Sequence, residues 1–246
     1  MTINWPMMLD RRSLLGTMML GAISLASTRV LAQGAKPKIA TIGAGREGGA
    51  LGSLFAKDGF QVMFSSRNPD QLKELVETAG PNAKAGTVAD AGAFGDVVLI
   101  VVPYTAMEGI AKDYGKALAA KQLVMDVSNP IARRDGEDFV KKVNEQGGAG
   151  LYTAKLLPGV PLVRAFNAIG YSGLAKAAHR SGTPLGVPIA GDDPKAITLA
   201  SSLIKQIGFE PVLIGGLSKG KYLVPGTPLG GEQTPDELRK ASAGLA

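Results

Sequence analysis

Three glycines with a fixed spacing stand between an apolar run and a helix-like segment, and this feature constrains the fold most strongly. The run "KIATIG" ends at Gly43, and Gly45 and Gly48 complete the pattern GxGxxG at the start of "GGALGSLFAKDG". Gly43 permits a tight turn, Gly45 lets the backbone approach a pyrophosphate, and Gly48 lets the helix pack closely on the sheet. Because helix N-termini bind anions, this unit predicts a dinucleotide-binding fold.

Apolar runs alternate with helical segments along the rest of the chain. The segments "QVMFSS", "DVVLIVVP" and "QLVMDVSNP", and later "PLVRAFN", "GVPIAGD" and "EPVLIGG", are predicted strands. Helical patterns such as "PDQLKELVETAG" and "PKAITLASSLIKQIG" lie between them. This alternation predicts an α/β, Rossmann-like, doubly wound and mostly parallel sheet. We expect the domain over residues 36–217, followed by a small Gly- and Pro-rich C-terminal extension over residues 218–246.

The first 32 residues have the composition of a targeting segment. Arg11 and Arg12 precede the apolar stretch "LLGTMMLGAISLAS", and Ala32 stands at a suitable cleavage point. The stretch is too short and too rich in Gly and Ser for a membrane span. The pattern is typical of a twin-arginine export signal over residues 1–32. It predicts a periplasmic mature chain that begins near Gln33, without stable membrane insertion. The alternatives are the general secretory route, an uncleaved helix, or a start codon placed too early.

Composition excludes several kinds of site. The net charge of +6 is not clustered with aromatic residues, so nucleic acid is not an expected partner. The chain has no cysteine, which excludes disulfides, thiolate catalysis and iron–sulfur clusters. Its single histidine, His179, is expected at a surface helix end. The pair Asp192-Asp193 precedes Pro194, which is typical of a helix start. We therefore expect no metal site.

The end of the second predicted strand distinguishes the two nicotinamide cofactors. NAD enzymes place Asp or Glu there to bind the ribose 2′-hydroxyl. This chain carries Ser65, Ser66, Arg67 and Asn68 instead. Hydroxyl donors and a planar cation suit a 2′-phosphate, which a carboxylate would repel. The segment predicts NADP as the cofactor. The alternative is that Arg67 only caps the loop and that Asp70 serves the ribose.

Ligands of open α/β sheets lie beyond the carboxyl ends of the strands. Three later strand ends therefore join the predicted site, although each could also be an ordinary strand-to-loop ending. Prolines and small residues there would line a slot for a flat ring, and no catalytic acid–base pair stands out. The predicted cofactor contacts are Gly43, Ala44, Gly45, Arg46, Glu47, Gly48, Ser65, Ser66, Arg67, Asn68, Val102, Pro103, Tyr104, Ser128, Asn129 and Asn167.

From about Lys36 to Leu229, the chain resembles the NADP oxidoreductases that depend on the deazaflavin coenzyme F420. The resemblance rests on the glycine turn, "SSRN", "VLIVVP", "VRAFNAIG", "VPIAGDDPKA" and "GFEPVLIGGLSKGKYL". It implies that Ser66 and Arg67 bind the 2′-phosphate. It also implies that hydride passes directly between nicotinamide and deazaflavin, without a protein acid or base. A homodimer is among the expected assemblies, although "VPGTPLGGEQTPDELRKASAG" stands where the family has its C-terminal helix.

The expected function is that of an NADP-dependent oxidoreductase. Its partner would be a small-molecule hydride acceptor of the flavin-like or deazaflavin type. One alternative is a non-catalytic nucleotide-binding module or sensor. Another is an enzyme of the imine- or pyrroline-reducing type, which would need a helical dimerisation domain for which this chain lacks room.

Overall fold

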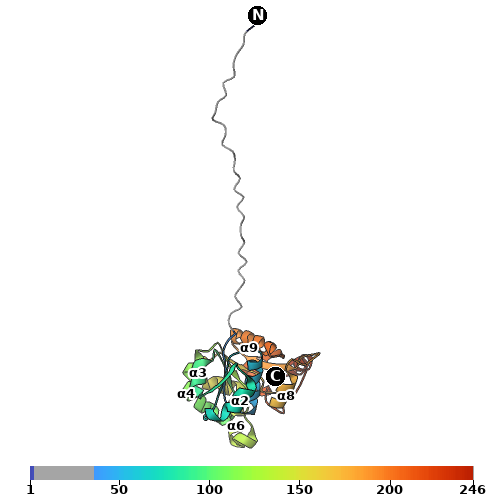
Figure 1. Cartoon of the computed structure of the whole chain (residues 1–246). Coiled ribbons are helices and arrows are strands. Elements are labelled where there is room, and N and C mark those ends of the chain that lie inside the picture. The colour runs from blue at the N-terminus through green and yellow to red at the C-terminus, as the bar shows by residue number, and fades with distance from the viewer. Residues whose placement is uncertain (3–35, 246) are drawn as a thin grey trace. The chain divides into compact units, whose positions relative to one another are not determined.

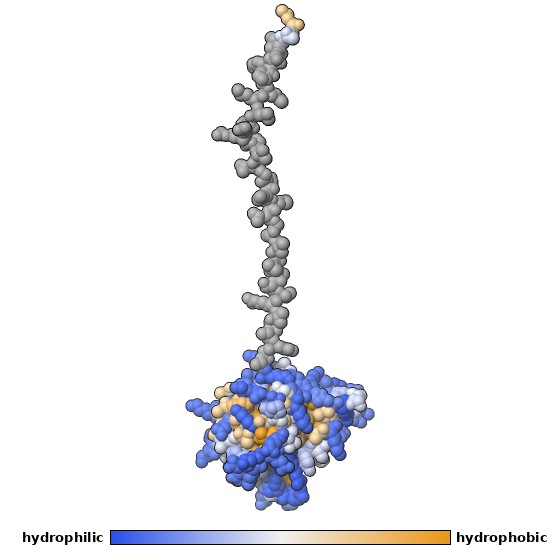
Figure 2. Space-filling view, in the orientation of Figure 1, coloured by the Kyte–Doolittle hydropathy of each residue, from blue (hydrophilic) through white to orange (hydrophobic). Residues whose placement is uncertain are grey.

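The computed structural model describes residues 1–2 and 36–245. From Lys36 onward the chain forms one compact unit. The predicted export signal lies outside the described residues. None of the helices that the structure describes is both long and apolar enough to cross a membrane. Hydrophilic side chains cover most of the face of the compact unit that Figure 2 shows, and apolar groups gather in smaller patches.

An eight-stranded sheet with the order β3-β2-β1-β4-β5-β6-β7-β8 forms the centre of this unit. The pairings from β3 to β6 are all parallel, β7 is antiparallel to β6, and β8 is parallel to β7. The predicted α/β, Rossmann-like and mostly parallel sheet is confirmed. The strands are β1 Ile39–Ile42, β2 Val62–Ser65, β3 Ala83–Gly86, β4 Val97–Ile100, β5 Leu123–Asp126, β6 Leu162–Arg164, β7 Gly186–Gly191 and β8 Glu210–Gly215.

Helices cover both faces of the sheet, with α3 and α4 on one side of the unit and α8 on the other (Figure 1). Three 3-10 turns accompany them: η1 Pro69–Leu72, η2 Tyr104–Ala106 and η3 Leu217–Tyr222. The helices are α1 Arg46–Lys57, α2 Lys73–Ala79, α3 Val88–Phe94, α4 Met107–Ala119, α5 Ala132–Asp135, α6 Glu137–Glu145, α7 Ala149–Leu156, α8 Tyr171–Ala177, α9 Pro194–Gln206 and α10 Pro235–Ala243.

Strand β4 shows why a continuous apolar run is needed at the centre of the sheet. Val97 and Leu99 belong to the cluster that includes α1, α2, α8 and α9. Val98 and Ile100 belong to the cluster that includes α3, α4, α6 and α7. All four residues are fully buried. Successive side chains of a strand point to opposite faces, so a strand covered on both faces must be apolar at every position.

The edge strand β3 and the helix after it were not predicted from the sequence. β3 has the sequence AKAG and is partly exposed, so it lacks the apolar signal of a buried strand. Helix α3 begins with a capping box, in which Thr87 Oγ1 accepts from the backbone N–H of Asp90 and the Asp90 carboxylate accepts from the N–H of Thr87. The helix predicted to start at Pro69 instead begins with the turn η1.

Residues 218–245 pack against the last two strands. Leu223, Leu229 and Leu238 are fully buried and form a cluster with Ala190 of β7 and Val212 of β8. The backbone N–H of Gly186 donates to the carbonyl of Gln233 at 2.9 Å. Helix α10 begins with a second capping box, between Thr234 and Glu237. This segment therefore belongs to the same compact unit as the sheet.

Candidate dinucleotide-binding site

In the glycine turn between β1 and α1, two of the three glycines have no room for a side chain. Gly43 has a φ of +97°, and a Cβ there would lie 2.2 Å from the carbonyl oxygen of Val101. A Cβ on Gly48 would lie 2.0 Å from the carbonyl oxygen of Gly43. A Cβ on Gly45 would meet nothing within 4 Å. Gly43 and Gly48 are thus required by packing inside the protein, whereas Gly45 faces open space at the N-terminus of α1.

Two cavities meet at this turn. The first, of about 730 Å³, is called here the Arg67 cavity, and the second, of about 830 Å³, the Glu47 cavity. Both are lined by Gly45, Val101, Val102 and Pro103. They open at the carboxyl ends of β1 and β4, where the strand order reverses, which is the usual ligand position in a doubly wound sheet. The Arg67 cavity is further lined by Ile42, Gly43, Ala44, Ser65, Ser66, Arg67, Gln71, Leu72, Val88, Thr105, Ala106 and Ile110.

Ser65, Ser66 and Arg67 all line the Arg67 cavity, but their polar groups differ in availability. The Ser65 hydroxyl is buried and donates to the carbonyl of Thr41 at 2.6 Å. The Ser66 hydroxyl accepts from the backbone N–H of Asn68 at 3.1 Å and retains its own hydrogen for a ligand. Arg67 is exposed and has no hydrogen-bond or ion-pair partner within residues 36–245. Its guanidinium is therefore the available cation at this cavity.

Two predicted residues near this cavity do not line it. Asn68 is exposed and contributes its backbone N–H to the turn with Ser66. Asp70, the alternative ribose ligand, lies on η1 and is absent from the lining, whereas its neighbours Gln71 and Leu72 are present. Within the part of the chain that the structure describes, the lining thus contains a cation and no carboxylate.

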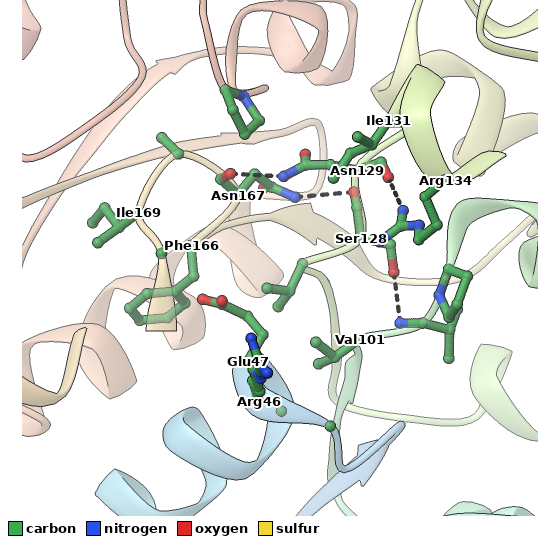
Figure 3. A pocket seen from close by; sticks show the side chains of 18 of the residues that line it. Arg46, Glu47, Val101, Ser128, Asn129, Ile131, Arg134, Phe166, Asn167 and Ile169 are labelled. Carbon is green, nitrogen blue, oxygen red and sulfur yellow. Dashed lines mark hydrogen bonds between the residues drawn. The ribbon is translucent and has the colours of Figure 1, made fainter. Parts of the chain in front are cut away.

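The Glu47 cavity brings together the predicted strand-end residues Ser128, Asn129 and Asn167 (Figure 3). Ser128 Oγ accepts from the N–H of Val102 at 3.1 Å and donates to the carbonyl of Ile100 at 3.2 Å. Asn129 Nδ2 donates to the carbonyl of Asn167 at 2.7 Å, and Asn167 Nδ2 donates to the carbonyl of Ser128 at 3.3 Å. These polar groups tie together the loops that follow β4, β5 and β6.

The wall of this cavity is mainly apolar. Val101, Val102 and Pro103 line it from the loop after β4, and five glycines leave space around the helix and loop termini. The further lining residues are Arg46, Glu47, Gly48, Val127, Ile131, Arg134, Phe166, Ala168, Ile169, Gly170, Pro225, Gly226 and Gly231. An apolar cavity with a few polar groups is typical of a ligand pocket.

A buried ion pair that was not predicted from the sequence lies beneath the loops that line the Glu47 cavity and bonds to one of them. Arg164 Nη1 donates to Asp126 Oδ2 at 2.5 Å, and both side chains are fully buried. Arg164 Nη2 also donates to Asn129 Oδ1 at 3.1 Å. Thr153 Oγ1 and the N–H of Ser128 complete the bonding of the carboxylate. The pair thus fixes the orientation of the Asn129 amide.

Tyr104 was predicted as a ligand contact, and the structure places it elsewhere. Its side chain is fully buried in the cluster that contains α4 and α7 and lines neither cavity. The hydroxyl donates to the carbonyl of Ala149 at 2.6 Å. Burial raises the pKa of Tyr104 well above its ordinary value. Because η2 turns directly after Pro103, the tyrosine points into the core instead of toward a ligand.

Glu47 has a property that the turn motif alone did not indicate. Its side chain extends from the first turn of α1 toward Phe166 (Figure 3). Oε1 is buried and has no hydrogen-bond partner among the described residues. Burial raises the pKa of Glu47 to about 7, and the hydrogen bond from the backbone N–H of Tyr171 opposes this shift. The neighbouring Arg46 guanidinium lies 5.7 Å from the centre of the Tyr171 ring.

Two further expectations concern acidic residues and the histidine. Asp193 caps α9, since its carboxylate accepts from the N–H groups of Lys195 and Ala196. No group of His, Asp or Glu side chains within the described ranges is arranged to hold a metal ion. His179 is exposed just after α8 and pairs with Asp58 at 2.9 Å.

Comparison with known proteins gives one family and several similar structures. Residues 38–130 match the family described as NADP oxidoreductase, coenzyme F420-dependent. A hypothetical protein from Sinorhizobium meliloti shares 25% identity over 81% of this chain and 96% of its own, with a TM-score of 0.68. A candidate F420-dependent NADP reductase from an Arthrobacter species shares 20% identity over 76% of this chain and 88% of its own, with a TM-score of 0.66.

An imine reductase from Myxococcus stipitatus, solved in complex with NADP+, has the same fold over a shorter share of its length. It is 16% identical with a TM-score of 0.55, and the match covers 75% of this chain and 57% of the reductase. The family match runs from β1 past the end of β5, and so includes the glycine turn and residues 65–67. This chain is thus similar to NADP oxidoreductases over residues 38–130, and it shares the fold of the solved reductases named above.

Proposed function

We propose that this protein is an NADP-dependent oxidoreductase that transfers hydride between NADP(H) and a flavin-like or deazaflavin acceptor. One observation carries the proposal: two cavities meet at the glycine turn, and one of them contains an arginine without a partner in the described chain. Two cavities that share this turn offer a separate space for each half of a dinucleotide. The guanidinium of this arginine supplies the positive charge and the N–H donors that bind a 2′-phosphate.

The fit to NADP(H) follows from the chemistry of each part. The pyrophosphate would bind at the N-terminus of α1, where Gly45 leaves open space. The adenosine half would occupy the Arg67 cavity, with its 2′-phosphate near Ser66 and Arg67. The nicotinamide half would then enter the Glu47 cavity. Bound there, the cofactor supplies or accepts hydride.

The acceptor is proposed from the family match and from the character of the Glu47 cavity. Ile131, Phe166, Ile169 and Pro225 give it apolar walls suited to a second flat ring. The matched family is described as dependent on coenzyme F420. A deazaflavin or flavin, which accepts hydride on one ring atom and a proton on a ring nitrogen, fits these walls.

The experiment combines binding with turnover. Purified protein would be titrated with NADPH and NADH by nucleotide fluorescence, and then mixed with NADPH and a flavin, a deazaflavin or a quinone. We expect tight NADPH binding and loss of absorbance at about 340 nm with a flavin-like acceptor only. Failure to bind either nucleotide would contradict the proposal. Binding without turnover of any acceptor would favour a non-catalytic sensor instead.

We propose in addition that the protein acts after export to the periplasm by the twin-arginine route. This rests on Arg11 and Arg12, the moderate apolar stretch that follows them, and the small residue at Ala32. The twin-arginine route carries folded proteins, so a nucleotide site that forms only on folding could cross with its cofactor bound.

A further inference from the structure

Two residues that line the Glu47 cavity each carry a buried oxygen atom that has no hydrogen-bond partner among the described residues. One is Glu47 Oε1, and the other is Oδ1 of Asn167, a residue that is 3% exposed. Both residues line the cavity, from α1 and from the loop after β6. Buried polar atoms are nearly always bonded in folded proteins. This cavity is therefore suited to a ligand that brings hydrogen-bond donors or positive charge.

No charged side chain among the described residues contributes to the shifted pKa of Glu47. The other ionisable residues that line the cavity are Arg46 and Arg134. Arg134 pairs with Asp135 at 2.8 Å, and Arg46 lies over the Tyr171 ring. Helix α8, which packs on α1, contributes Tyr171 and Lys176, and the carboxylate of Glu232 lies against Gly173 of the same helix. The carboxyl group of Glu47 receives a hydrogen bond only from the backbone N–H of Tyr171 among described groups.

A nicotinamide ring beside Glu47 would shift the pKa of its carboxyl group in opposite directions in the two redox states of the ring. The oxidised ring carries a positive charge, which favours an ionised carboxylate close by. The reduced ring is neutral and would bury the carboxyl group further, which favours its protonated form. Since the pKa of Glu47 is already raised to about 7, either change alters its proton occupancy near neutral pH.

We propose that Glu47 is the proton-exchanging residue of this pocket, protonated beside reduced nicotinamide and ionised beside oxidised nicotinamide. The inference rests on the proposed function. In the reducing direction, hydride carries two electrons from the nicotinamide to the acceptor, so the nicotinamide is oxidised and the acceptor reduced. Glu47 gives its carboxyl proton to a nitrogen or oxygen of the acceptor, and its O–H bond breaks as the new N–H or O–H bond forms. The resulting carboxylate stays beside the cationic ring until solvent protonates it again.

This role departs from what the family resemblance implies, namely hydride transfer without a protein acid or base. Transfer of its proton to the acceptor requires the protonated form of Glu47, whereas the ionised form stabilises the oxidised cofactor. A higher pH should therefore strengthen the binding of NADP+ relative to that of NADPH. Glu47 then links the proton balance of the reaction to the redox state of the cofactor.

Binding of the two nucleotides tests the proposal without any acceptor. The purified full-length chain would be titrated with NADP+ and with NADPH by isothermal calorimetry at pH 7, in two buffers of different ionisation enthalpy. At a pH close to the pKa of Glu47, about half a proton is available for release and half for uptake. We expect NADP+ to release protons and NADPH to take them up. The 2′-phosphate also titrates near pH 6, but it is common to both nucleotides and cancels in the difference.

The same difference should appear in affinity. Between pH 6 and pH 8, the affinity for NADP+ relative to NADPH should rise severalfold, toward the limit of about tenfold that a one-unit difference in the pKa of Glu47 between the two complexes sets. In Glu47→Gln, which retains size and hydrogen-bonding groups, both the proton difference and this rise should vanish. Glu77→Gln, on the exposed face of α2 outside both cavities, is the matched control and should behave as wild type.

The outcomes separate this inference from the proposed function. If neither nucleotide binds, the proposed function fails and the inference fails with it. If both bind with equal proton counts and a ratio of affinities that does not change with pH, only the inference is wrong. A proton difference that persists in Glu47→Gln would likewise overturn it, because another group would then be responsible.

Discussion

Arg164 and Asp126 form a fully buried ion pair that connects the core of the sheet to the Glu47 cavity, because the same guanidinium also donates to Asn129. The pair joins the ends of two neighbouring strands, β5 and β6. A buried ion pair is expensive to break from one side, since it leaves an uncompensated charge.

Removing one partner of this pair should destabilise the fold strongly. We expect Arg164→Leu to lower the free energy of unfolding by about 3–5 kcal/mol, because Asp126 would remain buried without its counter-charge. Urea denaturation followed by circular dichroism measures the change. Lys141→Ala breaks an exposed pair with Glu145 and should cost less than about 0.5 kcal/mol. Equal decreases in the free energy of unfolding for the two substitutions would contradict a larger stabilisation by the buried pair.

The glycine turn offers two substitutions with opposite consequences. Gly45→Val should leave the free energy of unfolding within about 1 kcal/mol of wild type, because a Cβ there meets no atom within 4 Å. It should abolish NADPH binding, because the side chain would fill the space for the pyrophosphate. Gly48→Val should destabilise the protein itself, since its Cβ would lie 2.0 Å from the carbonyl oxygen of Gly43. Thermal melts and fluorescence titration separate the two effects. Normal NADPH binding by Gly45→Val would place the nucleotide elsewhere.

Cofactor choice should depend on Arg67. We expect wild-type protein to bind NADPH at least about tenfold more tightly than NADH, which corresponds to about 1.4 kcal/mol. Arg67→Asp should reverse this preference, because a carboxylate repels a 2′-phosphate and can bind a ribose hydroxyl. Fluorescence titration of both nucleotides measures the ratio. Arg133→Asp changes charge equally on exposed α5, outside the Arg67 cavity, and should leave the ratio unchanged. Equal affinities in wild type would contradict the NADP assignment.

Stability should depend on pH through Glu47. Its pKa rises from 4.5 to about 7 on folding, so the folded state holds a proton that the unfolded state has lost between these values. The stabilising contribution is complete below pH 4.5 and is lost as the pH rises to 7. The free energy of unfolding of Glu47→Gln, relative to that of wild type, should therefore rise by about 1–3 kcal/mol between pH 4.5 and pH 7. Urea melts of the nucleotide-free protein at several pH values measure this gain. A constant difference between the two proteins would mean that the carboxyl group titrates normally.

Export can be tested independently of the enzyme activity. Replacing Arg11 and Arg12 with Lys should block twin-arginine transport and leave uncleaved precursor in the cytoplasm. Cell fractionation followed by N-terminal sequencing checks both location and processing, with the wild type expected to begin near Gln33. Unchanged processing of the double variant would indicate the general secretory route. A wild type that is never cleaved and stays in the cytoplasm would contradict the export proposal.

Features that depend on neighbouring residues were predictable from the sequence. The glycine pattern and the apolar runs such as "DVVLIVVP" led to the mostly parallel Rossmann-like sheet, because strand and helix periodicities are local properties of the chain. Edge strand β3 was not predicted, because its partly exposed sequence AKAG has no apolar pattern that would indicate a strand. The antiparallel direction of β7 depends on pairing between Val163 and Gly191, which are far apart in the sequence.

The chemistry of the site depended on the tertiary structure. The sequence indicated that Tyr104 and Glu47 stand next to a ligand-binding turn, but only packing decides where their side chains go. Tyr104 follows a 3-10 turn into the core, whereas Glu47 faces a cavity in which burial raises its pKa. Arg164 reaches Asp126 because β5 and β6 are neighbours in the sheet. Burial, pairing and pKa values arise from groups distant in sequence, and no local pattern of residues encodes them.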